Sequence, residues 1–451
     1  MRPLSAQWVA NAAGGTLVAD VDTTVSSVVK DSRDAVPGAL YAAFVGERVD
    51  GHDYVDAARE RGATLSLVSH SVDGPHIVVD DVAVALGRLA RAYLAELRLQ
   101  GDITVIGITG SNGKTTTKDL LAQTLPDVVA PEGSYNNEIG LPLTVLAADH
   151  TTRHLVLEMG ASAPGDIAHL TRIAPLYVAV VLMIGSAHAG GYASLEALAE
   201  EKATILDGLV PDGVGLINAD DPRVSPMAGR APRTLTFGFG EADVAGRDRR
   251  TERGRAHFSV DGVEVALTLV GDHHATNALA ALAVARVCGL DPEAAAAAVS
   301  RARPLSAHRM ALTERQDGVT ILDDAYNASP ESMRAAFRAL RSVAEGGTSW
   351  AVIGEMLEMG EASIQAHDDL GIDAVRLGIS HLVVVGKGAR PAYVSAVREG
   401  SWGDEAAFVD TIDEALALVG DRVAPGDTVL VKGSHGTGLW RLADELTRER
   451  S

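Results

Sequence analysis

The chain has 451 residues, of which 47% are hydrophobic and 22% charged, so it can bury sizeable cores and is not a disordered protein. At roughly 150 residues per domain, this length predicts about three domains. Its 60 acidic and 39 basic residues give a formal net charge of −21, which disfavours non-specific nucleic-acid binding because phosphate backbones are repelled. The single cysteine, Cys288, cannot form an intramolecular disulfide, so we expect a reducing compartment.

We expect a soluble cytoplasmic protein without membrane insertion. The longest apolar stretch, around Leu176 to Ile184, is shorter than the ~20 residues that a spanning helix needs, and it indicates a buried strand. Residues 1–15 contain no basic segment followed by an apolar core, so we expect no signal peptide.

Short apolar runs alternate with longer helical stretches rich in Ala and Leu, which is typical of α/β domains with mainly parallel sheets. The expected strands are 64–68, 76–79, 103–108, 155–158, 178–184, 215–218, 319–322, 350–353, 382–385 and 428–431. The expected helices are 82–99, 116–125, one beginning at Asn277 and one across the alanine tract 293–299. Residues 234–269 alternate apolar and polar residues, which predicts an antiparallel ribbon at the edge of the second domain. The stretch 301–309 is the expected domain connection.

The strongest motif is GITGSNGKT, residues 107–115, a close relative of the P-loop pattern. An apolar strand precedes it and a helical stretch follows it, as the motif requires. Glycines let backbone N–H groups surround phosphate oxygens, and the helix N-terminus adds partial positive charge. Lys114 is then placed to neutralise the β- and γ-phosphates, and the Thr115 hydroxyl to bind Mg²⁺. The alternative is a glycine-rich turn that ends a strand.

Three further side chains could belong to the same site. Glu158 ends an apolar strand before the turn at Gly160, and a carboxylate at the carboxyl end of a strand beside a P-loop suits a metal ligand. His188 also follows an apolar strand, where a lone histidine is either structural or functional. Lys202 lies in a helical stretch that would ordinarily present it to water, and alone it indicates nothing.

Together these motifs resemble the Mur ligases, ATP-dependent enzymes of peptidoglycan assembly. The similar runs are 31–33, 37–43, 46–53, 109–119, 135–144, 157–161, 187–188, 194–196 with Lys202, 271–280, 322–333, 354–360 and 431–434. They follow the family's order and occur in all three blocks. The run 322–333 resembles the members that add D-alanyl-D-alanine more than their sister ligases, and the Asp-Asn-Pro-Arg motif of the diaminopimelate- or lysine-adding members is not found.

The resemblance implies three α/β domains and an amide ligase. Residues 1–99 would form a small domain for the UDP-muramoyl substrate, 100–308 a central P-loop ATPase domain with a mainly parallel sheet, and 309–451 a Rossmann-like domain. The implied reaction adds D-alanyl-D-alanine to UDP-N-acetylmuramoyl tripeptide through an acyl phosphate, with release of ADP and phosphate. The implied partners are these small molecules, with no nucleic acid, and the protein is expected to be a monomer whose third domain closes over ATP.

The resemblance also assigns residues and cofactors: ATP, two Mg²⁺ ions and a carbamylated Lys202. One Mg²⁺ would bind Thr115 and Glu158, and the second would bind His188 and the Lys202 carbamate. The implied catalytic residues are Lys114, Glu158, His188 and Lys202. The implied ATP-binding residues are Asn112, Gly113, Lys114, Thr115, Thr116, Asn277 (adenine), Arg309 (γ-phosphate), Asp323 (ribose), Tyr326 and Asn327 (adenine). The implied substrate-binding residues are Ser32, Arg33, Arg48, Asn136, Asn137, Ser162 and Lys432.

Other interpretations share parts of this pattern. A sister ligase, such as the diaminopimelate-adding enzyme or folylpolyglutamate synthase, would keep the phosphate site and take another acceptor. A nucleotide-dependent switch or binding protein would hydrolyse ATP slowly without an amine acceptor. Residues 323–330 also fit an ordinary helix start, with Asn327 or Ser329 as the cap and Pro330 in the first turn.

Overall fold

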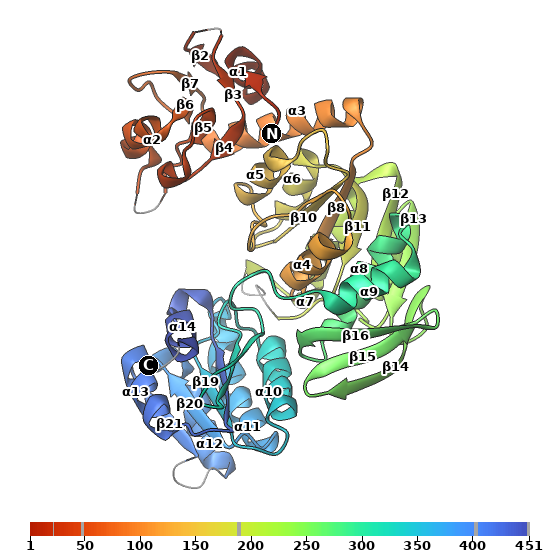
Figure 1. Ribbon diagram of the computed structural model, residues 1–451, viewed down its shortest axis with the longest axis vertical. Helices are drawn as coiled ribbons and strands as arrows, with labels where there is room; N and C mark the ends of the chain where they lie inside the picture. The colour runs from red at the N-terminus through yellow and green to blue at the C-terminus, as the bar shows by residue number, and fades with distance from the viewer. Residues whose placement is uncertain (21, 47–48, 187–190, 401–404, 449–451) are drawn as a thin grey trace.

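The computed structural model of the chain describes residues 1–20, 22–46, 49–186, 191–400 and 405–448. Figure 1 shows three bodies in chain order, with the second between the first and the third. Each body is built on its own sheet, and most neighbouring strands in these sheets run parallel. The predicted α/β class with mainly parallel sheets is therefore confirmed. No helix in the described part of the chain combines the length and the apolar character needed to cross a membrane.

The first body contains a five-stranded sheet in the order β2-β7-β6-β5-β4, in which only β2 is antiparallel to its neighbour. The bounds are β2 Thr16–Val18, β4 Ser27–Val29, β5 Ala39–Ala42, β6 Ala63–Val68 and β7 His76–Val78, with a separate pair β1 Leu4–Ser5 and β3 Thr24–Val25. Helix α1, Ala6–Ala13, begins at Ser5, whose hydroxyl accepts a hydrogen bond from the Trp8 backbone. Helix α2 covers Val55–Arg61.

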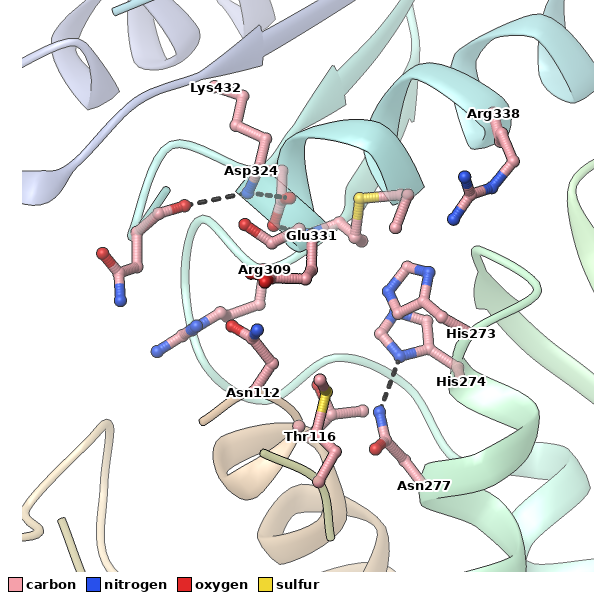
Figure 2. Close-up of a pocket in the computed structure, with 16 residues that line it drawn as sticks. Asn112, Thr116, His273, His274, Asn277, Arg309, Asp324, Glu331, Arg338 and Lys432 are labelled. Atoms are coloured by element: carbon pink, nitrogen blue, oxygen red, sulfur yellow. Dashed lines mark hydrogen bonds and ion pairs between the residues drawn. The ribbon is translucent and has the colours of Figure 1, made fainter. Parts of the chain in front are cut away.

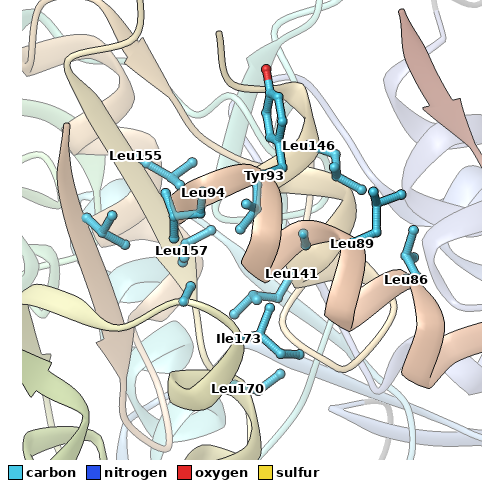
Figure 3. Close-up of a cluster of buried hydrophobic side chains, with 14 of the residues drawn as sticks. Leu86, Leu89, Tyr93, Leu94, Leu141, Leu146, Leu155, Leu157, Leu170 and Ile173 are labelled. Atoms are coloured by element: carbon cyan, nitrogen blue, oxygen red, sulfur yellow. The ribbon is translucent and has the colours of Figure 1, made fainter. Parts of the chain in front are cut away.

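Helix α3, Val82–Gln100, joins the first body to the second. The Asp81 carboxylate caps this helix, and the apolar face of the helix is buried along its whole length. The segment between the two bodies is therefore an amphipathic helix packed into a core, and not an exposed linker. Helix α1 packs against α3 in the first body, and the opposing surface of the second body is made by α5, Gly140–Ala147, α6, Asp166–Ile173, and β10, His154–Glu158. The residues of this cluster shown in Figure 3 are Leu86, Leu89, Tyr93, Leu94, Leu141, Leu146, Leu155, Leu157, Leu170 and Ile173. The first two bodies thus share one hydrophobic core.

The central sheet has nine strands in the order β16-β15-β14-β13-β12-β11-β8-β10-β9. Its strands are β8 Thr104–Thr109, β9 Val128–Val129, β11 Leu176–Val181, β12 Leu209–Asn218, β13 Arg233–Gly238, β14 Val244–Glu252, β15 Arg255–Val260 and β16 Val263–Val270, together with β10. Alternate residues of a strand face different cores. Leu155 and Leu157 lie in the core shared with α3, and Val156 lies in the core formed with α4 (Lys114–Thr124) and α8 (His274–Val287). The carboxyl ends of β8, β10 and β11, which are parallel neighbours, meet at one edge.

The predicted ribbon is only partly antiparallel. Strand β13 pairs in parallel with β12 and with the start of β14, and antiparallel pairing begins with β14 and β15. Residues 234–238 therefore belong to the parallel sheet, and that part of the expectation is wrong. The remaining central helices are α4 Lys114–Thr124, α7 Leu195–Ala203, α8 His274–Val287 and α9 Pro292–Arg301.

The third body has a six-stranded sheet in the order β17-β18-β22-β19-β20-β21, parallel except for the edge strand β17. The strands are β17 Ala311–Glu314, β18 Thr320–Asp323, β19 Ser349–Ile353, β20 His381–Val385, β21 Ala406–Val409 and β22 Thr428–Lys432. The helices are α10 Pro330–Ala344, α11 Ser363–Arg376, α12 Arg390–Glu399, α13 Ile412–Arg422 and α14 Trp440–Thr447. Of the two caps left open for α10, the structure has Ser329, which forms a capping box with Ser332.

Candidate active site

The P-loop connects strand β8 to helix α4. Gly113 ends the loop at a φ of +90°, and a Cβ atom there would collide with the Asn277 side chain, so both the backbone and the neighbour require glycine. Lys114 is buried, and its Nζ donates to the Gly110 carbonyl at 2.7 Å. The loop thus places Lys114 and Thr115 at the N-terminus of a helix, as a phosphate site requires.

The charged groups beside the P-loop are enclosed. Burial lowers the pKa of Lys114 to about 8, and the nearby Glu158 carboxylate opposes this change. Burial raises the pKa of Glu158, although Lys114 and Arg309 pull it down. Lys114 is thus mainly protonated at neutral pH, and its charge lies where little water can screen it.

Arg309 comes from the domain connection and reaches the P-loop. Its guanidinium donates to the Thr115 hydroxyl at 3.2 Å and to the Ser134 hydroxyl at 3.1 Å. Thr115 Oγ1 also lies 3.2 Å from Glu158 Oε2 and 3.0 Å from Ser134 Oγ. The arginine stacks on the Tyr326 ring, with 4.1 Å from its Cζ to the ring centroid. Segments from the second and third bodies therefore meet at Thr115.

A cavity of about 220 Å³ lies over this group. Its lining residues are Ser111, Asn112, Gly113, Lys114, Thr115, Thr116, Ser134, Asn136, Arg309, Tyr326 and Asn327. Most of the lining is polar and cationic groups are present, which suits a chain of phosphates.

A second cavity, of about 240 Å³, adjoins the first and is shown in Figure 2. Its walls come from the P-loop, α8, the domain connection and α10, and they include Asn112, Gly113, Thr116, His273, His274, Asn277, Arg309, Asp324, Asn327, Glu331, Arg338 and Lys432. Asn277 Nδ2 lies 3.2 Å from His274 Nδ1. Because the two cavities share Asn112, Gly113 and Thr116, one nucleotide can extend from one into the other.

A third cavity, of about 380 Å³, lies on the other side of the phosphate cavity. Three of the predicted substrate residues, Asn136, Asn137 and Ser162, line it, and Asn136 also lines the phosphate cavity. The Asp166 carboxylate accepts hydrogen bonds of 2.8 Å from the backbone N–H groups of Ser162 and Ala163 and so holds this wall in place.

Two ionisable side chains of the second body have buried atoms without a hydrogen-bond partner. Glu158 Oε1 and Lys202 Nζ are both buried without a hydrogen-bond partner, and Lys202 is 0% exposed. Burial and the charge of Lys114 lower the pKa of Lys202 to about 7. The helical pattern had suggested a lysine facing water, whereas α7 turns it inward. Within the described residues, no group of three or more His, Cys, Asp or Glu side chains has the arrangement of a metal site.

Other predicted residues lie elsewhere. The Asp323 carboxylate faces His308 Nδ1 at 2.7 Å. Ser32 and Arg33 lie in a short turn of the first body, where Arg33 pairs with Asp31 and holds the pKa of that carboxyl at about 2. Lys432 is buried at the second cavity, against Asp324, and not at the third. His188 and Arg48 lie outside the described residues.

The sequence interpretation missed Ser134, Asp324 and the pair His273 and His274. Ser134 lies just before the similar run 135–144 and has no spacing of its own to mark it. Asp324 follows Asp323 inside a similar run, and the resemblance implies a role, at the ribose, only for Asp323. The histidines also lie in a similar run, 271–280, in which the resemblance implies a role only for Asn277.

Three family descriptions match the chain. They are the Mur ligase family catalytic domain over residues 24–94, the Mur ligase middle domain over 108–285, and the Mur ligase glutamate ligase domain over 308–435. Together they cover most of the chain and all three bodies.

Curated relatives are similar along their full length. The UDP-N-acetylmuramoyl-tripeptide–D-alanyl-D-alanine ligase of Mycobacterium tuberculosis (strain ATCC 25618 / H37Rv) is 42% identical, with 100% of this chain and 98% of that protein aligned. The protein of the same name from Bacillus subtilis (strain 168) is 35% identical, with 94% and 93% aligned.

Solved structures agree with these relatives. MurF from Acinetobacter baumannii has a TM-score of 0.87 and 29% identity, over 99% of each chain. MurF ligase from Thermotoga maritima in complex with ADP has a TM-score of 0.81 and 30% identity, over 94% of this chain and 98% of that one. With a P-loop, an arginine from the domain connection and three matched domains in order, the chain belongs to the Mur ligase family.

Proposed function

We propose that this protein is an ATP-dependent ligase that adds D-alanyl-D-alanine to UDP-N-acetylmuramoyl tripeptide during peptidoglycan synthesis. The substrates follow from the full-length relatives, which carry the name of that reaction. Use of ATP is supported by the P-loop and by the ADP complex of the Thermotoga maritima protein. A sister ligase is less well supported, because a diaminopimelate ligase structure matches at a TM-score of only 0.53 and 18% identity.

One observation carries the reaction type. Asn136 lines both the phosphate cavity and the third cavity, so a γ-phosphate and the carboxylate of a second substrate can meet beside it. In the proposed reaction a carboxylate oxygen attacks the γ-phosphorus and ADP leaves, which gives an acyl phosphate. The amine of the dipeptide then attacks the acyl carbon, and phosphate leaves with its bonding pair as the amine loses a proton.

Cationic side chains of this protein would offset the repulsion between the substrate carboxylate and the phosphates of ATP. The Lys114 ammonium and the Arg309 guanidinium face the phosphate cavity from opposite bodies, and charge development in phosphoryl transfer is stabilised mainly by such positioned cations. Asn112, Gly113 and Thr116 would hold the nucleotide between the two cavities, with Asn277 and Asn327 near the base and Tyr326 supporting Arg309. Asn136, Asn137 and Ser162 would bind the muramoyl substrate.

The residues fit Mg²⁺, which when bound offsets the negative charge of phosphate and carboxylate oxygens. Thr115 and Glu158 would hold one ion, because the Glu158 carboxylate is buried beside the Thr115 hydroxyl with Oε1 unpartnered. A second ion would bind His188 and a carbamate on Lys202. The buried, unpartnered Lys202 amine supports this proposal: an uncharged amine adds to CO₂ with loss of a proton, and the product is an anionic oxygen ligand.

The domain boundaries and the remaining assignments are part of the same proposal. Residues 1–99 would bind the uridine nucleotide, with Ser32, Arg33 and Arg48 as contacts. Residues 100–308 would bind ATP and 309–451 would close over it. Asp323 would bind the ribose after its contact with His308 is broken. Lys432, which lines the second cavity, would bind the substrate there.

The experiment measures phosphate release from ATP with UDP-muramoyl tripeptide, with and without D-alanyl-D-alanine, and identifies the product by mass. Turnover that needs both substrates and yields the pentapeptide supports the proposal. Turnover with a different amine would indicate a sister ligase, and release that ignores the acceptor would indicate a nucleotide switch. Lys114→Met should lower kcat by about 100-fold or more, and Lys387→Met, at an exposed lysine, should not.

The carbamate has its own test. In buffer depleted of CO₂ and bicarbonate, activity of the unmodified chain should fall and return when bicarbonate is added. Lys202→Ala should be inactive in both buffers, whereas Lys202→Glu, which carries a permanent carboxylate, should be independent of bicarbonate. Full activity of Lys202→Ala in depleted buffer would contradict the proposal.

A further inference from the structure

The domain connection is attached to the P-loop helix α4 by a buried carboxylate. Asp119 Oδ2 accepts hydrogen bonds from the backbone N–H groups of Leu305, at 3.3 Å, and Ser306, at 3.0 Å. Asp119 Oδ1 accepts a third from the Ser306 hydroxyl at 3.1 Å. Asp119 is 4% exposed, and three donors on one buried carboxylate fix the position of the segment that carries them.

The neighbouring Lys118 completes this contact. Its ammonium pairs with Asp119, and it donates to the Pro131 carbonyl at 3.0 Å and to the Ser306 hydroxyl at 3.2 Å. Lys118 is also buried, so the charge of Asp119 is balanced where water does not reach. Ser306 is thus held by both members of the pair.

One turn further along α4, Gln123 binds the same segment. Its Oε1 accepts from the Arg303 N–H at 3.0 Å, and its Nε2 donates to the Arg303 carbonyl at 2.8 Å. Residues four apart lie on the same face of a helix, so Asp119 and Gln123 form one surface against residues 303–306. We call these contacts the α4–linker network.

Beyond Ser306, the third body holds the chain. His308 Nδ1 faces the Asp323 carboxylate at 2.7 Å, and the Met310 N–H donates to Asp324 Oδ1 at 3.2 Å. His308 and Met310 have φ angles of 57° and 52°, a left-handed conformation that residues other than glycine seldom adopt. Arg309 therefore lies between two residues that the third body holds, and it follows by three residues a segment that the second body holds.

We propose that Asp119 and Gln123 are positioning residues, which hold the backbone of residues 303–306 so that Arg309 reaches the phosphate site. The inference rests on the proposed function for the role of Arg309 at the γ-phosphate. Helix α4 begins with Lys114 and Thr115, so its first turn would bind phosphate. Its second and third turns would hold the segment that leads to Arg309, the residue facing that phosphate.

The physical reason is the length of the arginine side chain. Arg309 has many torsions, and its Nε is buried without a hydrogen-bond partner, so the guanidinium depends on a fixed backbone and on its contacts with Thr115, Ser134 and Tyr326. Phosphoryl transfer depends on the position of cations, and misplacement by about 1 Å can cost about 100-fold in rate.

The test is a double-mutant cycle with Gln123→Ala, Ser306→Ala and Asp119→Asn, each alone and with Arg309→Ala. Acting through Arg309, each variant should lower kcat about tenfold in the unmodified background and less than about twofold when Arg309 is absent. The matched control is Leu305→Ala, because the Leu305 side chain is 59% exposed and the network uses only its backbone. It should keep kcat unchanged.

Thermal unfolding of every variant separates this role from general destabilisation. If Asp119→Asn does not fold, Gln123→Ala and Ser306→Ala carry the test, since neither removes a charged side chain. If each variant lowers kcat by the same factor with and without Arg309, the proposal is overturned. Such a result would show that the α4–linker network does not affect kcat through Arg309.

A binding measurement keeps this inference separate from the proposed function. Calorimetric titration with a non-hydrolysable ATP analogue and with ADP needs no acceptor substrate. Substitutions in the α4–linker network should reduce the ratio of the affinity for the ATP analogue to the affinity for ADP. In the Arg309→Ala background the same substitutions should leave this ratio unchanged. An unmodified chain that fails to ligate would contradict the proposed function, whereas an unchanged triphosphate preference in Gln123→Ala and Ser306→Ala would contradict the inference.

Discussion

The Glu331 carboxylate accepts two hydrogen bonds from Ser186, one from the backbone N–H and one from the hydroxyl, each at 3.0 Å. Ser186 follows strand β11 of the second body, and Glu331 is in the first turn of α10 of the third. At the other end of α10, Ser342 Oγ accepts from the Gly254 N–H at 2.9 Å, and Glu345 pairs with Arg253 at 3.0 Å. Helix α10 therefore connects the two bodies at both of its ends.

Glu331→Ala should favour separation of the third body. Two hydrogen bonds to a charged, half-buried carboxylate are lost, a change of about 2 kcal/mol in the free energy of closure. Small-angle scattering with a bound ATP analogue should give a larger radius of gyration, and kcat should fall. Glu345→Ala is the matched control on the same helix, because its pair with Arg253 is exposed and worth less than about 1 kcal/mol. Equal effects of both variants would contradict a specific role for Glu331.

Lys432→Met should destabilise the third body strongly. The Lys432 ammonium lies 2.5 Å from Asp324 Oδ2 and 2.8 Å from the Asn327 carbonyl, and it is buried. Its removal leaves a buried carboxylate without a cation, which costs about 3–5 kcal/mol. Urea unfolding measures the change. Arg376→Met, at an ion pair of 2.8 Å with Glu399 that is exposed on the arginine side, should cost less than about 1 kcal/mol.

The protein should lose stability as the pH falls below neutral. Burial, with the charges of Lys432, Arg338 and Arg249, lowers the pKa of His273 to about 4, from 6.5 in the unfolded chain. Between these values the unfolded chain binds more protons than the folded one, so the free energy of unfolding decreases as pH falls from 6.5 to 4.

His273→Asn removes this titration and should flatten the dependence, by at most about 1.4 kcal/mol per pH unit. Urea midpoints at pH 7, 6 and 5 give the slope. His150, an exposed histidine, supplies the control His150→Asn. If both variants keep the slope of the unmodified chain, His273 is not the source of the acid sensitivity.

The single cysteine should be slow to alkylate in the folded protein. Burial raises the pKa of the Cys288 thiol to about 11, so little thiolate is present at pH 8. Iodoacetamide labelling followed by mass spectrometry should be about 100-fold faster in urea, where the pKa returns to about 8.5. Cys288→Ser should remain unlabelled in both conditions. Equal rates with and without urea would contradict the raised pKa of this partly buried thiol.

Local patterns predicted much of the molecule because they follow from short-range geometry. The P-loop lies between its strand and helix as expected, and α3 begins at Val82, directly after its Asp81 cap. The alternation in 234–238 was misleading, because β13 lies inside the sheet, paired in parallel with β12 and β14, and yet most of its residues are only partly buried.

The site could be predicted only where residue type and spacing carry the information. Glu158 was predicted because strand ends meet at one edge, and the structure places its carboxylate 3.2 Å from the Thr115 hydroxyl, while its role in binding a metal stays a prediction. The burial of Lys202 and the contact of Ser134 with Arg309 depend on packing between segments far apart in the chain. A run such as Thr117 to Asp119 contains a buried ion pair, but the sequence does not say which loop it faces.

The packing of helix α3 decides where the chain can be truncated or its first body exchanged. Because Leu86, Leu89 and Leu94 lie in a core built mainly by the second body, a truncation that starts after Gln100 would expose the apolar surfaces of α5 and α6 to water. An exchange of the first body for that of another ligase should therefore be cut before Asp81, so that α3 stays with the chain that follows it. The exchanged segment would then end before Asp81, whereas the proposed substrate-binding domain ends at residue 99, inside α3.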